Sequence, residues 1–124
     1  MSTSAITAIG QIAINVKEPA RATAFYRDVI GLKFPFAAGT LAFFDCGGVR
    51  LMLTTPEKPE FDHSSSILYF KVADLRASHD RMKSAGASFE DEPHLIARMP
   101  DHELWMCFFR DTEGNLLGLM SEVR

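Results

Sequence analysis

The sequence predicts an α+β fold built from two copies of a β-α-β-β-β module. Three observations support this prediction: strand and helix signals recur in the same order, glycines stop both helices, and a proline-containing segment separates the copies. With 124 residues the chain is expected to be a single domain, 1–124. Its modules are expected at about 6–54 and 65–123, joined by a linker at 55–64. A single irregular α+β domain without duplication is the alternative.

The first copy begins with a strand signal that is followed by a helix signal. Residues 11–16 alternate in polarity, which is typical of a strand with one buried face. Pro19 suits the first turn of a helix, because its missing N–H would have no intrahelical partner there. Gly31 is expected to end this helix in a left-handed conformation. A strand–turn–strand signal at 43–53, with a Gly-Gly turn, completes the copy.

The second copy repeats this order after the linker. Residues 67–72 form the strand signal, Asp74 is expected to cap the helix, and Gly86 is expected to stop it. His79 falls in the middle of this helix, where we expect a surface or flanking position. The closing strand–turn–strand signal lies at 108–119.

Alternation along the strands separates a face under the helices from an open face. Ile12, Ile14 and Val16 are expected to pack under the first helix, and Leu68, Phe70 and Val72 under the second. The open face then mixes polar, aromatic and flexible apolar side chains: Gln11, Ala13, Asn15, Arg50, Met52, Thr54, Ile67, Tyr69 and Lys71. This mixed face is the candidate cleft. A charged residue such as Arg50 needs a partner or an anionic ligand there.

Charge and composition exclude several classes of function. Lysine and arginine total 13 against 16 aspartates and glutamates, so no basic surface for nucleic acid is expected. No apolar run approaches the roughly 20 residues of a spanning helix, and no secretory signal is evident, so we expect a cytoplasmic protein without a membrane partner. Cys46 and Cys107 are too few for a disulfide scaffold and are expected to be reduced.

Segments near the start and near the end of the chain resemble a known superfamily. The opening reads Ile-Ala-Ile-Asn-Val and later Ala-Phe-Tyr-Arg-Asp-Val-Ile-Gly-Leu, and the close reads Phe-Arg-Asp-Thr-Glu-Gly-Asn-Leu-Leu. With the repeated module, these segments resemble the vicinal oxygen chelate superfamily, which includes glyoxalase I, methylmalonyl-CoA epimerase, extradiol dioxygenases, fosfomycin-resistance thiol transferases and bleomycin-resistance proteins. The resemblance runs from about Ile6 to Val123. It implies a cupped, mostly antiparallel sheet of the glyoxalase/bleomycin-resistance/dioxygenase type, in chains that form homodimers.

The resemblance also implies a divalent metal ion held by histidine and glutamate at four equivalent strand positions. In this sequence those positions fall on Gln11, Met52, Ile67 (Ser66 if the register shifts by one) and Gly118. Methionine, isoleucine and glycine offer no suitable oxygen or imidazole ligand, and only the Gln11 carbonyl could coordinate weakly. We therefore expect neither a metal ion nor another cofactor.

A second group of polar residues lies at 94–105. It contains His94, His102, Glu103 and Trp105, and it is interpreted either as a polar surface loop or as a rim over the cleft with a histidine that moves protons. A metal site of His94, His102 and Glu103 would have suitable residue types but shows no spacing signature.

The function favoured by these observations is metal-free binding of a small organic molecule, as in the bleomycin-resistance branch. The expected ligand-binding residues are Gln11, Asn15, Arg50, Met52, Tyr69, His94, His102, Glu103, Trp105 and Gly118. The alternative is an enzyme of the superfamily, a lyase, epimerase or dioxygenase, with a relocated or metal-independent site near His94, His102 and Glu103. A third hypothesis is a structural or regulatory dimer whose cleft is filled by its own side chains.

Overall fold

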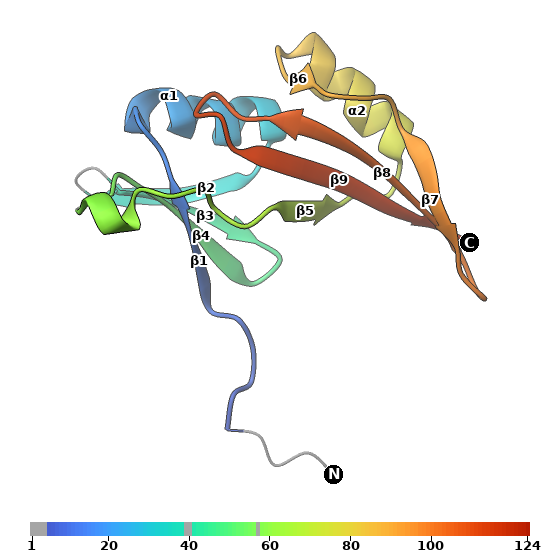
Figure 1. Ribbon diagram of the computed structural model, residues 1–124, viewed down its shortest axis with the longest axis horizontal. Helices are drawn as coiled ribbons and strands as arrows, with labels where there is room; N and C mark the ends of the chain where they lie inside the picture. Colours follow the sequence, from blue (N-terminus) through green and yellow to red (C-terminus); the bar gives the residue numbers. More distant parts are fainter. Residues whose placement is uncertain (1–4, 39–40, 57) are drawn as a thin grey trace.

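The computed structural model describes residues 5–38, 41–56 and 58–124, and it contains two β-sheets with a helical segment against each (Figure 1). The first module consists of β1 (Gln11–Asn15), α1 (Pro19–Ala24), a π-helical turn η1 (Phe25–Ile30), β2 (Lys33–Ala38), β3 (Leu41–Cys46) and β4 (Val49–Thr54). A short 3-10 helix, η2 (Pro59–Phe61), lies in the linker. The second module consists of β5 (Leu68–Lys71), α2 (Leu75–Ser84), β6 (Ser88–Phe89), β7 (His94–Arg98), β8 (Glu103–Arg110) and β9 (Leu116–Val123).

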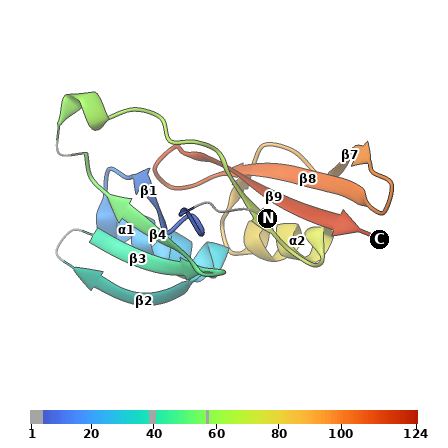
Figure 2. The same cartoon turned by 90° about the horizontal axis from the view of Figure 1, so that it is seen from below.

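Both sheets have the same strand order. The first sheet runs β1-β4-β3-β2 and the second runs β5-β9-β8-β6, with β7 also paired to β8. In each sheet the first strand of the module pairs in parallel with the last, and the other pairs are antiparallel. This shared topology confirms the α+β fold with a repeated module. The strands are divided between two sheets rather than joined in one, and the modules lie side by side (Figure 2).

The two helices begin with different kinds of cap. Asp74 caps α2 as predicted, since its Oδ1 accepts a hydrogen bond from the N–H of Ala77 at 3.0 Å. Glu18, at the start of α1, makes no such side-chain bond. Instead, Oε1 of Glu113 in the β8–β9 turn accepts from the N–H groups of Lys17 and Glu18, both at 2.8 Å. The first helix is therefore capped by the second module.

The predicted buried faces form the core. Ile14 and Val16 are almost fully buried, and Leu68, Phe70 and Val72 pack against the core from β5 and the residue after it. The core joins both modules and contains Ile14, Val16, Ala22, Phe25, Tyr26, Ala42, Phe44, Leu51, Leu53, Leu75, Met82, Ala87, Cys107, Phe109, Leu117 and Leu119. Both cysteines are free, and burial is the main cause that raises the pKa of the Cys107 thiol to about 11. Because the helices and these strand faces cover one another, the opposite faces of the sheets stay open.

His79 contradicts the prediction of a surface position, because it is only 1% exposed. Its Nδ1 lies 2.9 Å from Oδ1 of Asp80, and its ring lies 4.3 Å from the ring centre of Phe89. Its Nε2 lies 3.0 Å from Oε2 of Glu92, at an angle too poor for a hydrogen bond. The prediction of a surface position was wrong because Leu75, His79 and Met82 are spaced i, i+4 and i+7, which places His79 on the buried face of α2, where the Phe89 ring packs against it.

The β8–β9 turn, residues 111–115, connects the modules. The Tyr26 hydroxyl in η1 donates to Oδ2 of Asp111 at 2.7 Å, and Asn115 Nδ2 donates to the backbone oxygen of Asn15 at 3.0 Å. Burial first, and then the Asp111 carboxylate, raises the pKa of Tyr26, so the hydroxyl remains a donor. No helix in the described part of the chain is long and apolar enough to cross a membrane.

Candidate functional site

Gln11, Arg50 and Met52 lie together on the open face of the first sheet, next to Phe43. Arg50 Nε donates to Gln11 Oε1 at 2.8 Å, and Gln11 Nε2 lies 3.7 Å from the Met52 sulfur. The Arg50 guanidinium lies 5.5 Å from the Phe43 ring centre, within cation–π range. We call Gln11, Phe43, Arg50 and Met52 the first-sheet cluster. It presents a cation, an amide, a thioether and an aromatic ring on one face.

Tyr69, Phe108 and Gly118 form the second-sheet cluster on the open face of the second sheet. Gly118 in β9 pairs with Tyr69 in β5 and with Phe108 in β8. The two rings meet edge to face, with their centres 5.7 Å apart. A Cβ at position 118 would lie 2.8 Å from Tyr69 Cδ2, so the phenol ring lies directly across the glycine. Tyr69 remains 45% exposed and can therefore contact a ligand.

The two clusters exchange large and small side chains at equivalent positions. In the first sheet the small Ala13 pairs with the large Met52, whereas in the second the large Tyr69 pairs with Gly118. The aromatic neighbour on the next strand is kept, since Phe43 pairs with Met52 and Phe108 pairs with Gly118. In both sheets one large side chain, Met52 in the first and Tyr69 in the second, therefore covers the equivalent position between the paired first and last strands.

These residues do not fit the metal ion that the resemblance implies. Met52 and Gly118 supply no hard or imidazole donor, and Ile67 is an aliphatic side chain. The Gln11 carbonyl oxygen already accepts a bond from Arg50, whose positive charge opposes a second cation. Across the described residues, no group of three or more histidine, cysteine, aspartate or glutamate side chains is placed to hold a metal ion.

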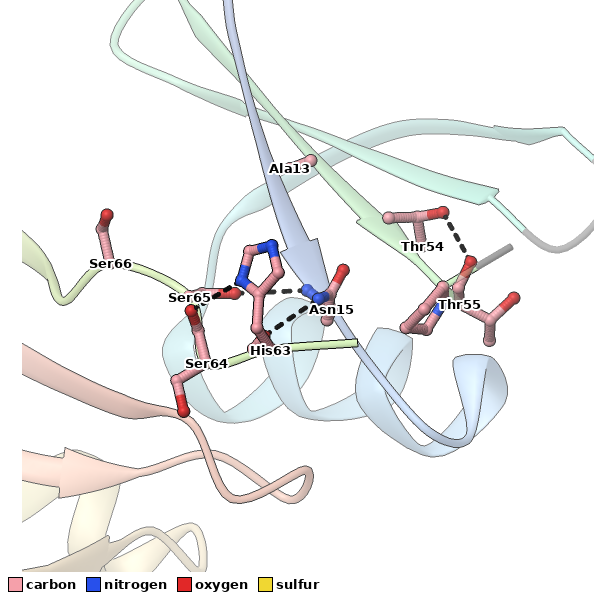
Figure 3. A pocket seen from close by; sticks show the side chains of 9 residues that line it. Ala13, Asn15, Thr54, Thr55, His63, Ser64, Ser65 and Ser66 are labelled. Atoms are coloured by element: carbon pink, nitrogen blue, oxygen red, sulfur yellow. Dashed lines mark hydrogen bonds between the residues drawn. The ribbon is translucent and has the colours of Figure 1, made fainter. Parts of the chain in front are cut away.

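Asn15 lies in a polar pocket of about 440 Å³ where β1 and β4 meet the linker (Figure 3). Its Nδ2 donates to the backbone oxygen of His63 at 3.0 Å, and its N–H donates to Ser65 Oγ at 3.4 Å. The lining residues are Ala13, Asn15, Thr54, Thr55, Pro56, His63, Ser64, Ser65 and Ser66. Sequence reasoning missed the linker residues, because it interpreted 55–64 as a spacer. The polar residues from His63 to Ser66 are evident in the sequence, but the sequence does not indicate that they lie next to β1.

The structure separates the residues grouped at 94–105. His94 pairs with Met106, which places it on the open face with Tyr69, and its Nδ1 lies 2.9 Å from the backbone oxygen of Glu92. His102 lies in the turn beyond the other end of β7, with its Nδ1 2.7 Å from Asp101 Oδ1. Glu103 accepts bonds from the side chains of Arg98 and Trp105. The two histidines therefore do not form a common site with Glu103, contrary to the alternative of a relocated site near these three residues.

Trp105 lies on the other side of the second sheet. It pairs with the buried Ser121 and shares its face with Cys107, whereas Phe108 and Tyr69 lie on the open face. The expectation of one cleft lined by both Trp105 and Tyr69 is therefore wrong. An odd number of positions separates Trp105 from Phe108, so the two side chains point to opposite faces of β8.

Comparison with known proteins agrees with this fold. A family model described as the Glyoxalase/Bleomycin resistance protein/Dioxygenase superfamily matches residues 8–119. The chain belongs to this superfamily.

Individual relatives cover nearly the whole chain. The uncharacterized protein YraH of Bacillus subtilis (strain 168) is 27% identical over 126 residues, which cover 88% of this chain and 94% of YraH. The structure of a lactoylglutathione lyase from Agrobacterium tumefaciens is similar, with a TM-score of 0.74, 24% identity and coverage of 95% and 96%. TnmS3, an antibiotic binding protein from Streptomyces sp. CB03234, has a TM-score of 0.77, 21% identity and coverage of 96% and 98%.

Proposed function

We propose that this protein binds a small organic molecule on the open faces of its sheets, without a metal ion. One observation carries the proposal: the positions where the superfamily holds its ion are occupied by side chains that present an organic surface. In the first sheet these are Met52 and the Arg50-bound Gln11, and in the second a tyrosine ring covers Gly118. Aromatic and thioether groups with a few polar donors are typical of small-molecule sites.

The chemistry of the clusters favours a flat aromatic ligand with an anionic or strongly accepting group. Tyr69, Phe108 and Phe43 offer ring contacts. The Arg50 guanidinium has further N–H donors beyond the one directed at Gln11, so it can bind a carboxylate or phenolate of the ligand. The antibiotic binding described for TnmS3 supports a small organic molecule as the ligand.

We also propose that the ligand is enclosed between two copies of the chain. The two clusters lie on separate sheets, and large apolar side chains remain exposed on or near the open face of the second sheet, including Ile67, Tyr69 and Ile96 at 43–45%. Exposed apolar groups of this size are typical of an interaction surface. Sedimentation should show a homodimer, and a monomer at all concentrations would contradict this part of the proposal.

Calorimetric titration of chelator-treated protein with a panel of planar aromatic acids and aromatic antibiotics tests the binding function. We expect saturable binding of at least one acid, weakened about tenfold by Arg50→Met, because a charge-assisted hydrogen bond contributes about 1.5–3 kcal/mol. Arg27→Met is the matched control, since Arg27 pairs with Asp28 on η1. The proposal fails if no compound binds saturably, or if binding requires an added divalent metal ion.

A further inference from the structure

A second pocket, of about 340 Å³, lies at the start of α2 on the helix side of the second sheet. Its lining residues are Ala73, Asp74, Leu75, Arg76, Pro93, Trp105, Ser121 and Val123. Trp105 and Ser121 lie on the face of β8 and β9 opposite to Phe108 and Gly118. The pocket is therefore separate from both clusters of the proposed function.

The walls of this pocket combine apolar side chains with the charged Asp74 and Arg76, and they include one indole ring. Trp105 Nε1 donates to Glu103 Oε1 at 3.2 Å, which fixes the edge of the ring. Within the described residues, no aromatic ring or cationic group lies against the indole face. Pro93 and the 48% exposed Val123 continue the apolar wall beside it. Trp105 is partly buried against the core and also lines the pocket, and an indole ring is the preferred aromatic partner of a cation.

The charges around the pocket also favour a cation. The guanidinium of Arg76 is directed at two carboxylates, 3.2 Å from Glu92 and 3.9 Å from Asp80. Asp74 accepts the N–H of Ala77 and, among the residues that the structure describes, forms no ion pair. Asp74 therefore has no ion-pair partner among the described residues, although it caps the positive end of α2, whereas the positive charge of Arg76 is balanced by two carboxylates.

We propose that this pocket binds an organic cation, a quaternary ammonium or protonated amine, between the Trp105 ring and the Asp74 carboxylate. The ammonium contacts the indole face, its alkyl groups contact Pro93 and Val123, and Asp74 supplies the opposite charge. Arg76 also lines the pocket, but its guanidinium is paired with Glu92 and Asp80.

The chain contains 1 tryptophan, so tryptophan fluorescence reports on this pocket alone. The test titrates the protein with choline and, in parallel, with its uncharged isostere 3,3-dimethylbutan-1-ol. We expect a saturable fluorescence change with choline at millimolar concentrations and about tenfold weaker binding of the alcohol. No saturable change, or equal binding of the two compounds, overturns the proposal.

Two variants separate this site from the proposed function. Asp74→Asn keeps an N-cap acceptor but removes the charge, and we expect it to weaken choline binding about fivefold while leaving thermal unfolding nearly unchanged. Trp105→Leu, followed by calorimetry, should abolish binding. Arg50→Met should leave choline binding unchanged, whereas it weakens aromatic acids on the open face. Unchanged choline affinity in Asp74→Asn contradicts the proposal, whatever the result of the aromatic acid panel.

Discussion

Gly118 has no side chain, and this absence determines which groups are exposed on the open face of the second sheet. The Tyr69 ring lies where a Cβ would otherwise stand, and the edge of Phe108 supports it. The ring is half exposed, so it can move at a modest cost when it is displaced. The contact between Tyr69 and Gly118 therefore shapes a ligand surface more than it stabilises the fold.

Gly118→Ala should destabilise the protein by about 1 kcal/mol, because the added methyl group forces the Tyr69 ring to shift. In a Tyr69→Ala background the same change should cost much less, since the clashing ring is gone. Urea unfolding of the four proteins measures this coupling. Equal costs in both backgrounds would show that Tyr69 does not lie across Gly118.

The Glu113 carboxylate is a buried anion whose partners come from both modules. Burial by itself would raise the pKa of Glu113, but hydrogen bonds from Arg21, the Glu18 and Lys17 N–H groups and the Thr112 hydroxyl outweigh it. Together they lower the pKa from 4.5 to about 2. A lowered pKa in the folded state means that the ionised carboxylate stabilises the fold above pH 4.5, and that this contribution is lost as the pH falls toward about 2.

Glu113→Gln should reduce the free energy of unfolding at pH 7 by about 3 kcal/mol, since the pKa is lowered from 4.5 to about 2 and each tenfold change in proton affinity corresponds to about 1.4 kcal/mol. The difference between variant and wild type should shrink as the pH falls from 4.5 toward about 2. Urea unfolding at several pH values measures it. A difference that stays constant with pH would show that the carboxylate charge is not what stabilises the junction.

At the scale of elements, the two helices show that one module completes the other. α2 has its own cap in Asp74, whereas the start of α1 depends on Glu113 from the β8–β9 turn. The end of η1 also depends on the second module, because Arg81 donates to the backbone oxygen of Ile30 at 3.1 Å. The first N–H groups and the last C=O groups of a helix have no partner within the helix, so they need partners of this kind.

Asp74→Ala should lower the free energy of unfolding by about 1 kcal/mol, because the Ala77 N–H at the start of α2 loses its acceptor. Asp74→Asn is the matched comparison and should change stability by only a few tenths of a kcal/mol, since asparagine is an equally good cap. Thermal unfolding of both variants measures the effect. Equal losses in the two variants would mean that the charge rather than the cap matters.

At the scale of the whole molecule, two sheets meet through a shared core and a polar junction and leave their other faces open. At the positions where the resemblance implies a metal ion, Gln11 contacts Met52 and Arg50, and the Tyr69 ring lies across Gly118. The bond from Arg50 to Gln11 and the position of the Tyr69 ring across Gly118 determine which groups these faces present.

Treatment with a strong chelator should therefore change neither the thermal unfolding temperature nor the affinity for an aromatic acid. A bound structural or ligand-binding metal ion would stabilise the folded state by mass action, so its removal would lower both. Calorimetry before and after chelation, together with elemental analysis, measures the effect. A metal ion retained at one equivalent per chain would contradict the prediction.

Much of the fold followed from local patterns. Alternation at 11–16 and 67–72 correctly separated buried from open faces, and Asp74 and Gly31 were recognised as helix signals because capping depends on neighbours along the chain. The grouping of Gln11, Arg50 and Met52 also followed from alternation once two strands were aligned.

The sequence by itself determined the repeated module and the superfamily, because these depend on residue type and on spacing within single elements. Only the tertiary structure decided that Trp105 and Tyr69 lie on opposite faces and that His94 and His102 stay apart. It also decided that the linker folds back over β1 and that Glu113 caps a helix far away in the chain. These features depend on contacts between distant segments, and no local pattern encodes which segments will meet.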